Sequence, residues 1–345
     1  MSKIKIGQIG VCHEHASGKI STLRKLPDIF EIVGVVDDRK STAAKFSGED
    51  LKPYDGLKWL TEEELFNIPG LQAVTVEAPN LDLVPTAIRC MERNLAIHMD
   101  KPGGENLEFF ARLRKGCEER SLPFQMGYMF RGNPAMQWCL EAVHNGWLGE
   151  IFEVQGNMSH NYGGDVYQEY LGNFKGGIMF NLGCHLIDFI VIMLGRPEKI
   201  TPFLNSAPGW PDKIKNNCLT IMEYSHTNVI LQACSLEADG VNHRRLKICG
   251  TKGSIELCPM ERFDGNPLLM ELFLNEEIPG YAAGSHTIDF GIVRDRYESQ
   301  LLELARIING EMENPYKYEH DYLVQDVLLA ASGYREWYRA VQNKF

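Results

Sequence analysis

The chain has 345 residues, of which 44% are hydrophobic and 23% are charged, and its formal net charge is -11. This composition excludes a disordered or low-complexity chain, and the length predicts two domains. The negative charge argues against nucleic-acid binding, which draws its non-specific affinity from clustered lysines and arginines.

Cysteine usage and apolar runs indicate the compartment. The chain has 9 cysteines, and no two of them form a Cys-x-x-Cys pair, so neither a disulfide scaffold nor a metal cluster is indicated. The N-terminal residues lack the apolar core of a signal peptide, and the strongest apolar run, residues 189–194, is too short to span a bilayer. We therefore expect a cytoplasmic protein with reduced thiols and no part in a membrane.

The first third of the chain alternates strand-like and helix-like segments, which predicts a parallel sheet with helices on both faces. Helical periodicity is clear in residues 81–94 and 106–120. The expected strands are residues 3–9, 31–36, 73–76, 95–99 and 124–128, with a weaker one at 57–60.

After about residue 122 the pattern changes to runs of strands, which favours an antiparallel sheet. One helix, residues 181–194, interrupts these strands, and helical periodicity returns from residue 297 to Val341. The expected strands are residues 151–158, 218–224, 229–236, 246–249, 254–258 and 268–274.

The start of the chain has features of a dinucleotide site. The first strand ends at Ile9-Gly10 and a helix follows, which is the arrangement in which a helix N-terminus faces a pyrophosphate. The second strand ends in Asp37-Asp38, where a carboxylate suits the ribose hydroxyls. Because that carboxylate would repel a 2′-phosphate, we expect NAD rather than NADP as the cofactor.

The glycine fingerprint of such sites is incomplete here, since Cys12 and His15 stand where glycines are wanted. Cys12 is small enough to let the backbone approach the phosphates. His13 and His15 also suggest a metal, but no third ligand is recognisable nearby, so we expect none. His13 is then either an imidazole that faces phosphate or part of a polar loop.

Two later turns follow expected strands. Ala78-Pro79-Asn80 lies where ribose and nicotinamide bind in an open parallel sheet, although Asn80 could simply cap the next helix. Asp100-Lys101-Pro102 places one lysine at the mouth of a parallel strand. The expected cofactor-binding residues are Ile9, Gly10, Cys12, His13, Asp37, Ala78, Pro79, Asn80, Asp100 and Lys101.

The helix predicted at residues 181–194 carries three polar side chains at helical spacing. Asn181, His185 and Asp188 fall at i, i+4 and i+7, so they lie on one face and can converge on one ligand. The spacing leaves a second interpretation open, in which His185 is a buried histidine whose hydrogen bond is satisfied by Asp188.

These motifs occur in a recognisable order. The set comprises Gly7-Gln8-Ile9-Gly10, Val35-Val36-Asp37, Ala78-Pro79-Asn80, Asp100-Lys101-Pro102, Arg131, Gly176-Gly177, the segment from Asn181 to Asp188, and Gly250-Thr251-Lys252-Gly253-Ser254. It resembles the Gfo/Idh/MocA oxidoreductase family, named for glucose-fructose oxidoreductase and inositol dehydrogenase, nearly from end to end. Two departures are the altered glycine loop and Asn181, which stands where the family commonly has aspartate.

The resemblance implies a Rossmann dinucleotide-binding domain, residues 1–123, and an α+β domain, residues 124–345. The second domain would have a large open, mostly antiparallel sheet and a helical tail, would bind the substrate and would form a homodimer or homotetramer. Lys101 and His185 would match the family's catalytic lysine and histidine, with Asn181 beside them. The expected substrate-binding residues are Arg131, His160, Tyr162, Asn173, Asn181 and Asp188, with Asp165 and Tyr167 in the same polar, aromatic segment.

Three functions remain open from the sequence. The first is an NAD-dependent dehydrogenase that oxidises a secondary hydroxyl of a sugar, inositol or glycoside, with an imidazole to take the proton and an ammonium group to stabilise the alkoxide. The second is a redox-neutral enzyme that cleaves glycosides by oxidation, elimination and reduction on a tightly bound, recycled NAD. The third, a nucleotide-binding regulator without catalysis, leaves Lys101 and His185 without a role.

Overall fold

The computed structural model describes residues 3–39 and 51–337, and it divides into two compact units. Residues 1–129 and 297–325 form the first unit, and residues 130–296 and 326–345 form the second. The predicted helical tail to Val341 ends outside the described residues.

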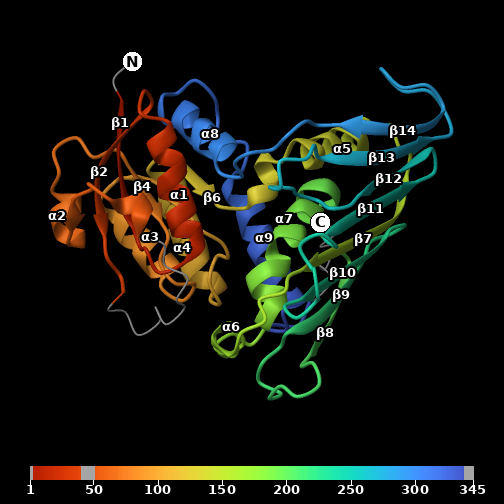
Figure 1. Cartoon of the computed structure of the whole chain (residues 1–345), viewed down its shortest axis with the longest axis horizontal. Coiled ribbons are helices and arrows are strands. Elements are labelled where there is room, and N and C mark those ends of the chain that lie inside the picture. Colours follow the sequence, from red (N-terminus) through yellow and green to blue (C-terminus); the bar gives the residue numbers. More distant parts are fainter. Residues whose placement is uncertain (1–2, 40–50, 338–345) are drawn as a thin grey trace, which may run out of the picture. The chain divides into compact units, whose positions relative to one another are not determined.

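The first unit contains a six-stranded parallel sheet in the order β3-β2-β1-β4-β5-β6 (Figure 1). This order is that of the Rossmann fold, so the predicted α/β class is confirmed. The strands are β1 (Ile4–Ile9), β2 (Phe30–Val36), β3 (Trp59–Leu60), β4 (Ala73–Val76), β5 (Ala96–Met99) and β6 (Phe124–Met126). Helices α1 (Glu14–Lys25), α2 (Glu62–Phe66), α3 (Leu83–Glu92), α4 (Leu107–Glu119) and α8 (Glu298–Ile308) belong to the same unit.

Capping residues define the N-termini of the helices in the first unit. Thr61 and Glu64 form a capping box at α2, and Asn106 accepts a hydrogen bond from the Phe109 amide at the start of α4. The N-cap of α3 is Asp82, so Asn80 does not cap that helix, as one interpretation of the sequence had it.

Helix α8 packs on the first unit, although the sequence boundary placed the whole tail with the second domain. Leu301 and Ala305 of α8 lie in the same buried cluster as Ile6 of β1 and Ile20 of α1. The apolar stripe of α8 is buried because the chain comes back to the first unit after residue 296. Helical periodicity predicts the helix but not the unit on which it packs. Helix α9 (Tyr318–Ala331) is divided between the two units.

The second unit contains an eight-stranded sheet in the order β14-β13-β12-β11-β7-β10-β9-β8. Its strands pair antiparallel except β7 with β10, which are parallel, so the mostly antiparallel sheet is confirmed. The strands are β7 (Ile151–Ser159), β8 (Lys199–Asn205), β9 (Asn217–Glu223), β10 (Asn228–Cys234), β11 (Arg245–Gly250), β12 (Gly253–Leu257), β13 (Leu269–Leu274) and β14 (Gly284–Asp289).

The sequence did not predict β8 and β14, which are the two edge strands of this sheet. β8 contains Pro202, which cannot donate a ladder hydrogen bond and is tolerated at an edge, and β14 begins with Gly284 and is mostly polar. The proline of β8 and the polar residues of β14 therefore weaken the strand signal in the sequence.

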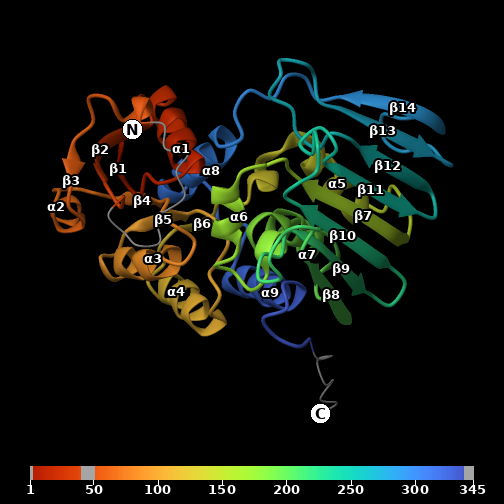
Figure 2. The same ribbon diagram turned by 60° about the horizontal axis from the view of Figure 1, so that its bottom comes forward.

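Helices of the second unit lie on one face of its sheet. They include α5 (Pro134–His144) and α7 (Cys184–Leu194), and Figures 1 and 2 show both on the same side of the strands. The sequence missed α5, although Asn133 caps it and Pro134 begins it, and also α6 (Asp165–Leu171). In β10 and β13 buried and exposed residues alternate, so these strands bury one face and expose the other.

Candidate functional site

The carboxyl ends of β1, β2, β4 and β5 meet at one edge of the parallel sheet, where open α/β sheets bind ligands. At the end of β1, Gly10 has φ +104, and a Cβ on it would lie 2.3 Å from the carbonyl oxygen of Glu77. Only glycine fits this turn, as the fingerprint requires of its first position.

Cys12, in place of the second glycine, turns toward the end of β2. Its thiol donates to Asp38 Oδ1 at 2.8 Å, and the same oxygen accepts from the Val11 amide at 2.9 Å. Burial raises the pKa of Asp38, and the hydrogen bond from Cys12 acts against that rise. From the sequence, Cys12 was expected only to be a small residue. In the structure, its hydrogen bond to Asp38 stabilises the loop that follows β1.

His13 caps helix α1. Its Nδ1 accepts from the Ala16 amide at 3.4 Å, and its Nε2 donates to the Glu77 carbonyl oxygen at 2.7 Å. This tautomer is neutral, and burial lowers its pKa to about 4. Both ring nitrogens are therefore committed to the backbone.

His15 lies against the loop that carries the predicted lysine. Its Nδ1 is 3.0 Å from Asp100 Oδ2, and Lys101, the next residue, is 4% exposed. Burial alone would raise the pKa of Asp100, but His15 and then Lys101 hold it well below its usual value. Asp100 is thus an anion enclosed by cationic or polar groups.

His13, His15 and Asp100 bring their donor atoms within 4.8 Å of one another, a grouping that could hold a metal ion. The sequence gave no third ligand for the two histidines, and Asp100 is that residue. A metal on His13 would cost the cap of α1 or the bond to Glu77, so the absence of a metal stays our prediction.

Glu77 lies beneath these loops and is fully buried, and within residues 3–39 and 51–337 neither of its carboxyl oxygens has a hydrogen-bond partner. Burial raises its pKa well above the usual value, and Lys19 only partly opposes this. Burial therefore favours the neutral, protonated form of this carboxyl group. No sequence pattern singles out Glu77, because only its burial makes it unusual.

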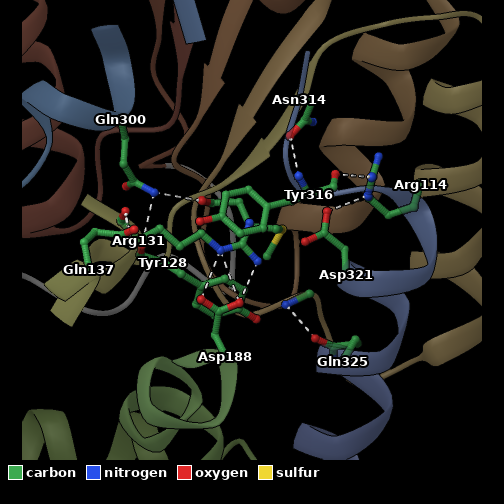
Figure 3. A network of polar contacts seen from close by, with 12 residues as sticks. Arg114, Tyr128, Arg131, Gln137, Asp188, Gln300, Asn314, Tyr316, Asp321 and Gln325 are labelled. Carbon is green, nitrogen blue, oxygen red and sulfur yellow. Dashed lines mark hydrogen bonds and ion pairs between the residues drawn. The ribbon is translucent and has the colours of Figure 1, made fainter. Parts of the chain in front are cut away.

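The loop after Lys101 is anchored by helix α9 (Figure 3). The Gly103 amide donates to Gln325 Oε1 at 3.1 Å, and Gln325 Nε2 donates to the Gly104 carbonyl oxygen. A Cβ on Gly103 would lie 2.6 Å from that Oε1, so the glycine is needed for this approach. No sequence signal links residues that lie 222 positions apart.

At the end of β2, Arg39 holds the expected ribose carboxylate. Its Nε lies 2.9 Å from both oxygens of Asp37, and its guanidinium stacks over Trp59. Asp37 is thus an ion-pair partner of Arg39, and its role as acceptor for ribose hydroxyls stays a prediction. The sequence missed Arg39, although a cation two residues after the carboxylate was visible.

The other residues that are expected to bind the cofactor lie at this edge of the sheet. Ile9 ends β1, and Ala78, Pro79 and Asn80 follow β4 as a buried turn. The turn at Gly10, the N-terminus of α1 and the carboxylates after β2 fit a dinucleotide, and these are the residues that would hold one.

In the second unit, one turn of π-helix, Met179–Gly183, precedes α7. Asn181 lies in this wider turn and His185 in the first turn of α7, and both are buried. π-turns of this kind often occur at functional sites. Asn181 Nδ2 donates to Tyr167 Oη at 2.7 Å, and the Phe130 ring lies against His185 at 5.8 Å.

Asp188, one turn further along α7, is paired with Arg131. The two side chains are each 1% exposed, and Arg131 Nη2 lies 2.6 Å from Asp188 Oδ1 (Figure 3). The structure thus brings together two residues that the sequence proposed separately as substrate contacts. Each satisfies the charge of the other.

The polar, aromatic segment after β7 forms a stack. The Tyr162 ring lies between His160, at 3.6 Å, and Tyr167, at 3.9 Å. Asp165 and Asn173 are exposed, and the Asn173 side chain donates to the Tyr170 carbonyl oxygen.

Comparison with known proteins gives the class of the chain. Residues 136–256 match the family model for the GFO/IDH/MocA C-terminal domain. A relative, bovine trans-1,2-dihydrobenzene-1,2-diol dehydrogenase, is 25% identical over 240 residues, which cover 68% of each chain.

Solved structures share the whole fold. An NAD-binding oxidoreductase of Klebsiella pneumoniae has a TM-score of 0.78 at 14% identity and covers 98% of this chain and 99% of its own. Levoglucosan dehydrogenase, in complex with NADH and levoglucosan, also has a TM-score of 0.78 at 14% identity, with 99% and 100% covered.

Fold and family model together define a two-domain protein of the oxidoreductase type. Over residues 136–256 the chain matches the Gfo/Idh/MocA family, and the resemblance stated from its motifs is confirmed.

Among the described residues, no helix is both long and apolar enough to cross a membrane. The expected cytoplasmic location stays a prediction.

Proposed function

We propose that this protein is an NAD-dependent dehydrogenase that oxidises a secondary hydroxyl group of a sugar, inositol or glycoside. The observation that carries the proposal is the buried His185 at the start of α7, directly after the π-turn with Asn181, within the segment that matches the family model. Levoglucosan dehydrogenase is similar to this chain in fold, and trans-1,2-dihydrobenzene-1,2-diol dehydrogenase is similar in sequence. Both names support a cyclic polyol as the substrate.

In this proposal, His185 accepts the hydroxyl proton, because an imidazole exchanges protons near neutral pH. Lys101 stabilises the developing alkoxide with its positive charge. Asn181 hydrogen-bonds the substrate. Arg131 and Asp188 hold α7 in place through their ion pair, which supports His185 from one turn away.

The cofactor would be held by the turn at Gly10, the N-terminus of α1 and the carboxylate of Asp37. Its nicotinamide would supply the hydride acceptor for the oxidised carbon. Asp37 favours NAD, whereas Arg39 beside it offers a charge that suits a 2′-phosphate. The preference for NAD therefore has to be measured together with the activity.

The test is reduction of NAD and of NADP by the purified protein with a panel of sugars, inositols and glycosides. We expect NADH formation with at least one cyclic polyol. His185→Gln and Lys101→Met should each lower kcat/KM at least about 100-fold, the scale of acid-base or charge stabilisation. Exposed His144→Gln and Lys115→Met are the matched controls and should retain activity.

Absence of turnover with both cofactors across the panel would contradict the proposal. So would full activity of the His185 variant.

A further inference from the structure

The side-chain amide of Asn181 is held in one orientation by a tyrosine. Its Nδ2 donates to Tyr167 Oη at 2.7 Å, and both residues are buried, at 7% and 6% exposure. An amide has one donor end and one acceptor end, so fixing the nitrogen decides where the oxygen points. The hydrogen bond therefore sets the direction of the Asn181 acceptor, Oδ1.

The hydroxyl group of Tyr167 is itself held by two hydrogen bonds. Tyr167 Oη accepts from Asn181, and Tyr167 also hydrogen-bonds Tyr162. Burial raises the pKa of Tyr167 well above its usual value, and the bond with Tyr162 acts in the same direction. The phenol thus stays protonated and gives a polarised row from Asn181 through Tyr167 to Tyr162.

Ring stacking keeps this row rigid. Tyr162 is stacked between His160, with an angle of 7° between the rings, and Tyr167, with an angle of 24°. The His160 amide donates to Cys234 at 2.8 Å and the Tyr162 amide to Ser235 at 2.9 Å, so the segment is tied to the end of β10. Three segments, namely the loop after β7, α6 and the π-turn, are joined at Tyr167.

We propose that Tyr167 is a positioning residue that orients Asn181 so that its Oδ1 accepts a hydrogen bond from a hydroxyl group of the substrate. The inference rests on the proposed function, in which Asn181 contacts the substrate. It adds that the site selects a hydrogen-bond donor at this position, as a polyol supplies, and disfavours a carbonyl or carboxylate there. An aspartate would need no such device, because its two oxygens are equivalent acceptors.

The first test is Tyr167→Phe, which removes the hydroxyl and keeps the stacked ring. We expect KM for the polyol to rise about tenfold, the effect of one hydrogen bond, with a smaller change in kcat. Tyr170→Phe is the matched control on the same helix and should leave KM unchanged. An unchanged KM in Tyr167→Phe would overturn the proposal.

A double-mutant cycle separates orientation from packing. In an Asn181→Asp background the acceptor no longer depends on orientation, so Tyr167→Phe should change KM less than about twofold there. A structural role of Tyr167 would give the same loss in both backgrounds. Equal losses would therefore overturn the proposal.

A third measurement does not need turnover. In protein labelled with ¹⁵N at asparagine, the Asn181 side-chain amide signals, assigned by their loss in Asn181→Ala, should shift and exchange faster with solvent in Tyr167→Phe but not in Tyr170→Phe. Unchanged signals in Tyr167→Phe would overturn the orientation of Asn181. A protein with no activity on the panel but with this shift would contradict the proposed dehydrogenase and leave the orienting bond supported.

Discussion

Arg131 and Asp188 form a two-pronged ion pair inside the second unit, with the Arg131 Nε 3.0 Å from Asp188 Oδ2 and Nη2 2.6 Å from Oδ1. The pair joins the short turn Met129–Gly132 to helix α7, which carries His185. The backbone carbonyl of Arg131 also accepts from the Gln137 side chain at 2.8 Å (Figure 3). Substitution of either charge leaves the other buried without its counter-ion.

We therefore expect Asp188→Asn to lower the free energy of unfolding by about 3 to 5 kcal/mol, the cost of an uncompensated buried charge. The double variant Arg131→Met with Asp188→Leu should recover most of that loss, because no charge remains. Urea denaturation measures both. The exposed pair of Lys199 and Glu223 is the control, and Glu223→Gln should change stability by less than about 1 kcal/mol. A loss below that level in Asp188→Asn would contradict the expectation.

Glu77 should make the protein less stable as pH rises. Its pKa in the folded state is raised, so below the ordinary value of 4.5 the carboxyl group is protonated in both states and its contribution is complete. Above that pH the unfolded chain releases a proton that the folded chain retains, and stability falls by up to about 1.4 kcal/mol per pH unit until the folded group ionises. Glu77→Gln keeps a neutral group and should remove this slope.

The measurement is the free energy of unfolding of wild type and Glu77→Gln from pH 5 to pH 8. The difference in the free energy of unfolding between Glu77→Gln and wild type should grow in favour of the variant as pH rises. Glu118→Gln, on the exposed face of α4, serves as the control and should run parallel to wild type. A constant difference between Glu77→Gln and wild type would show that Glu77 is ionised in the folded protein.

Gln325 should govern the order of the Lys101 loop. Gln325→Leu leaves the Gly103 amide and the Gly104 carbonyl without their partner, at a cost of about 1 to 3 kcal/mol. Hydrogen exchange of the Gly103 amide should accelerate accordingly. Exposed Gln72 accepts from the Lys5 amide at the surface, where water can replace it, so Gln72→Leu should have little effect. Unchanged exchange at Gly103 would show that the loop keeps its structure unaided.

The sheet face of the second unit that carries exposed apolar side chains is our proposed contact between copies of this chain. Strand register places Phe203, Ile230 and Phe273 on the same side, and each is at least 40% exposed. Exposed apolar side chains on one face of a monomer promote aggregation unless a partner covers them. We expect light scattering to show a dimer or tetramer, and Ile230→Lys with Phe273→Lys to dissociate it. Phe109→Lys, at an exposed apolar residue of α4, is the control. A monomeric wild type would contradict the expectation.

The sequence by itself determined the architecture and the local geometry of its turns. Alternation and helical periodicity predicted the strands and the longer helices of the first unit, but not the short α2, because each longer element buries one face and that requirement repeats along its own residues. The turn at Gly10 and the position of Lys101 after β5 followed in the same way, since both depend on neighbouring residues. Motif order was enough to indicate the family.

Tertiary structure decided which side chains meet. Arg131 and Asp188 lie 57 positions apart, and Cys12 and Asp38 lie 26 apart, so no periodicity relates them. Tyr167 is only 14 residues from Asn181, yet their hydrogen bond requires α6 to fold back on the π-turn. The docking of α8 on the first unit was hidden for the same reason. Such contacts depend on the path of the whole chain, and a local pattern records only which face of an element is buried.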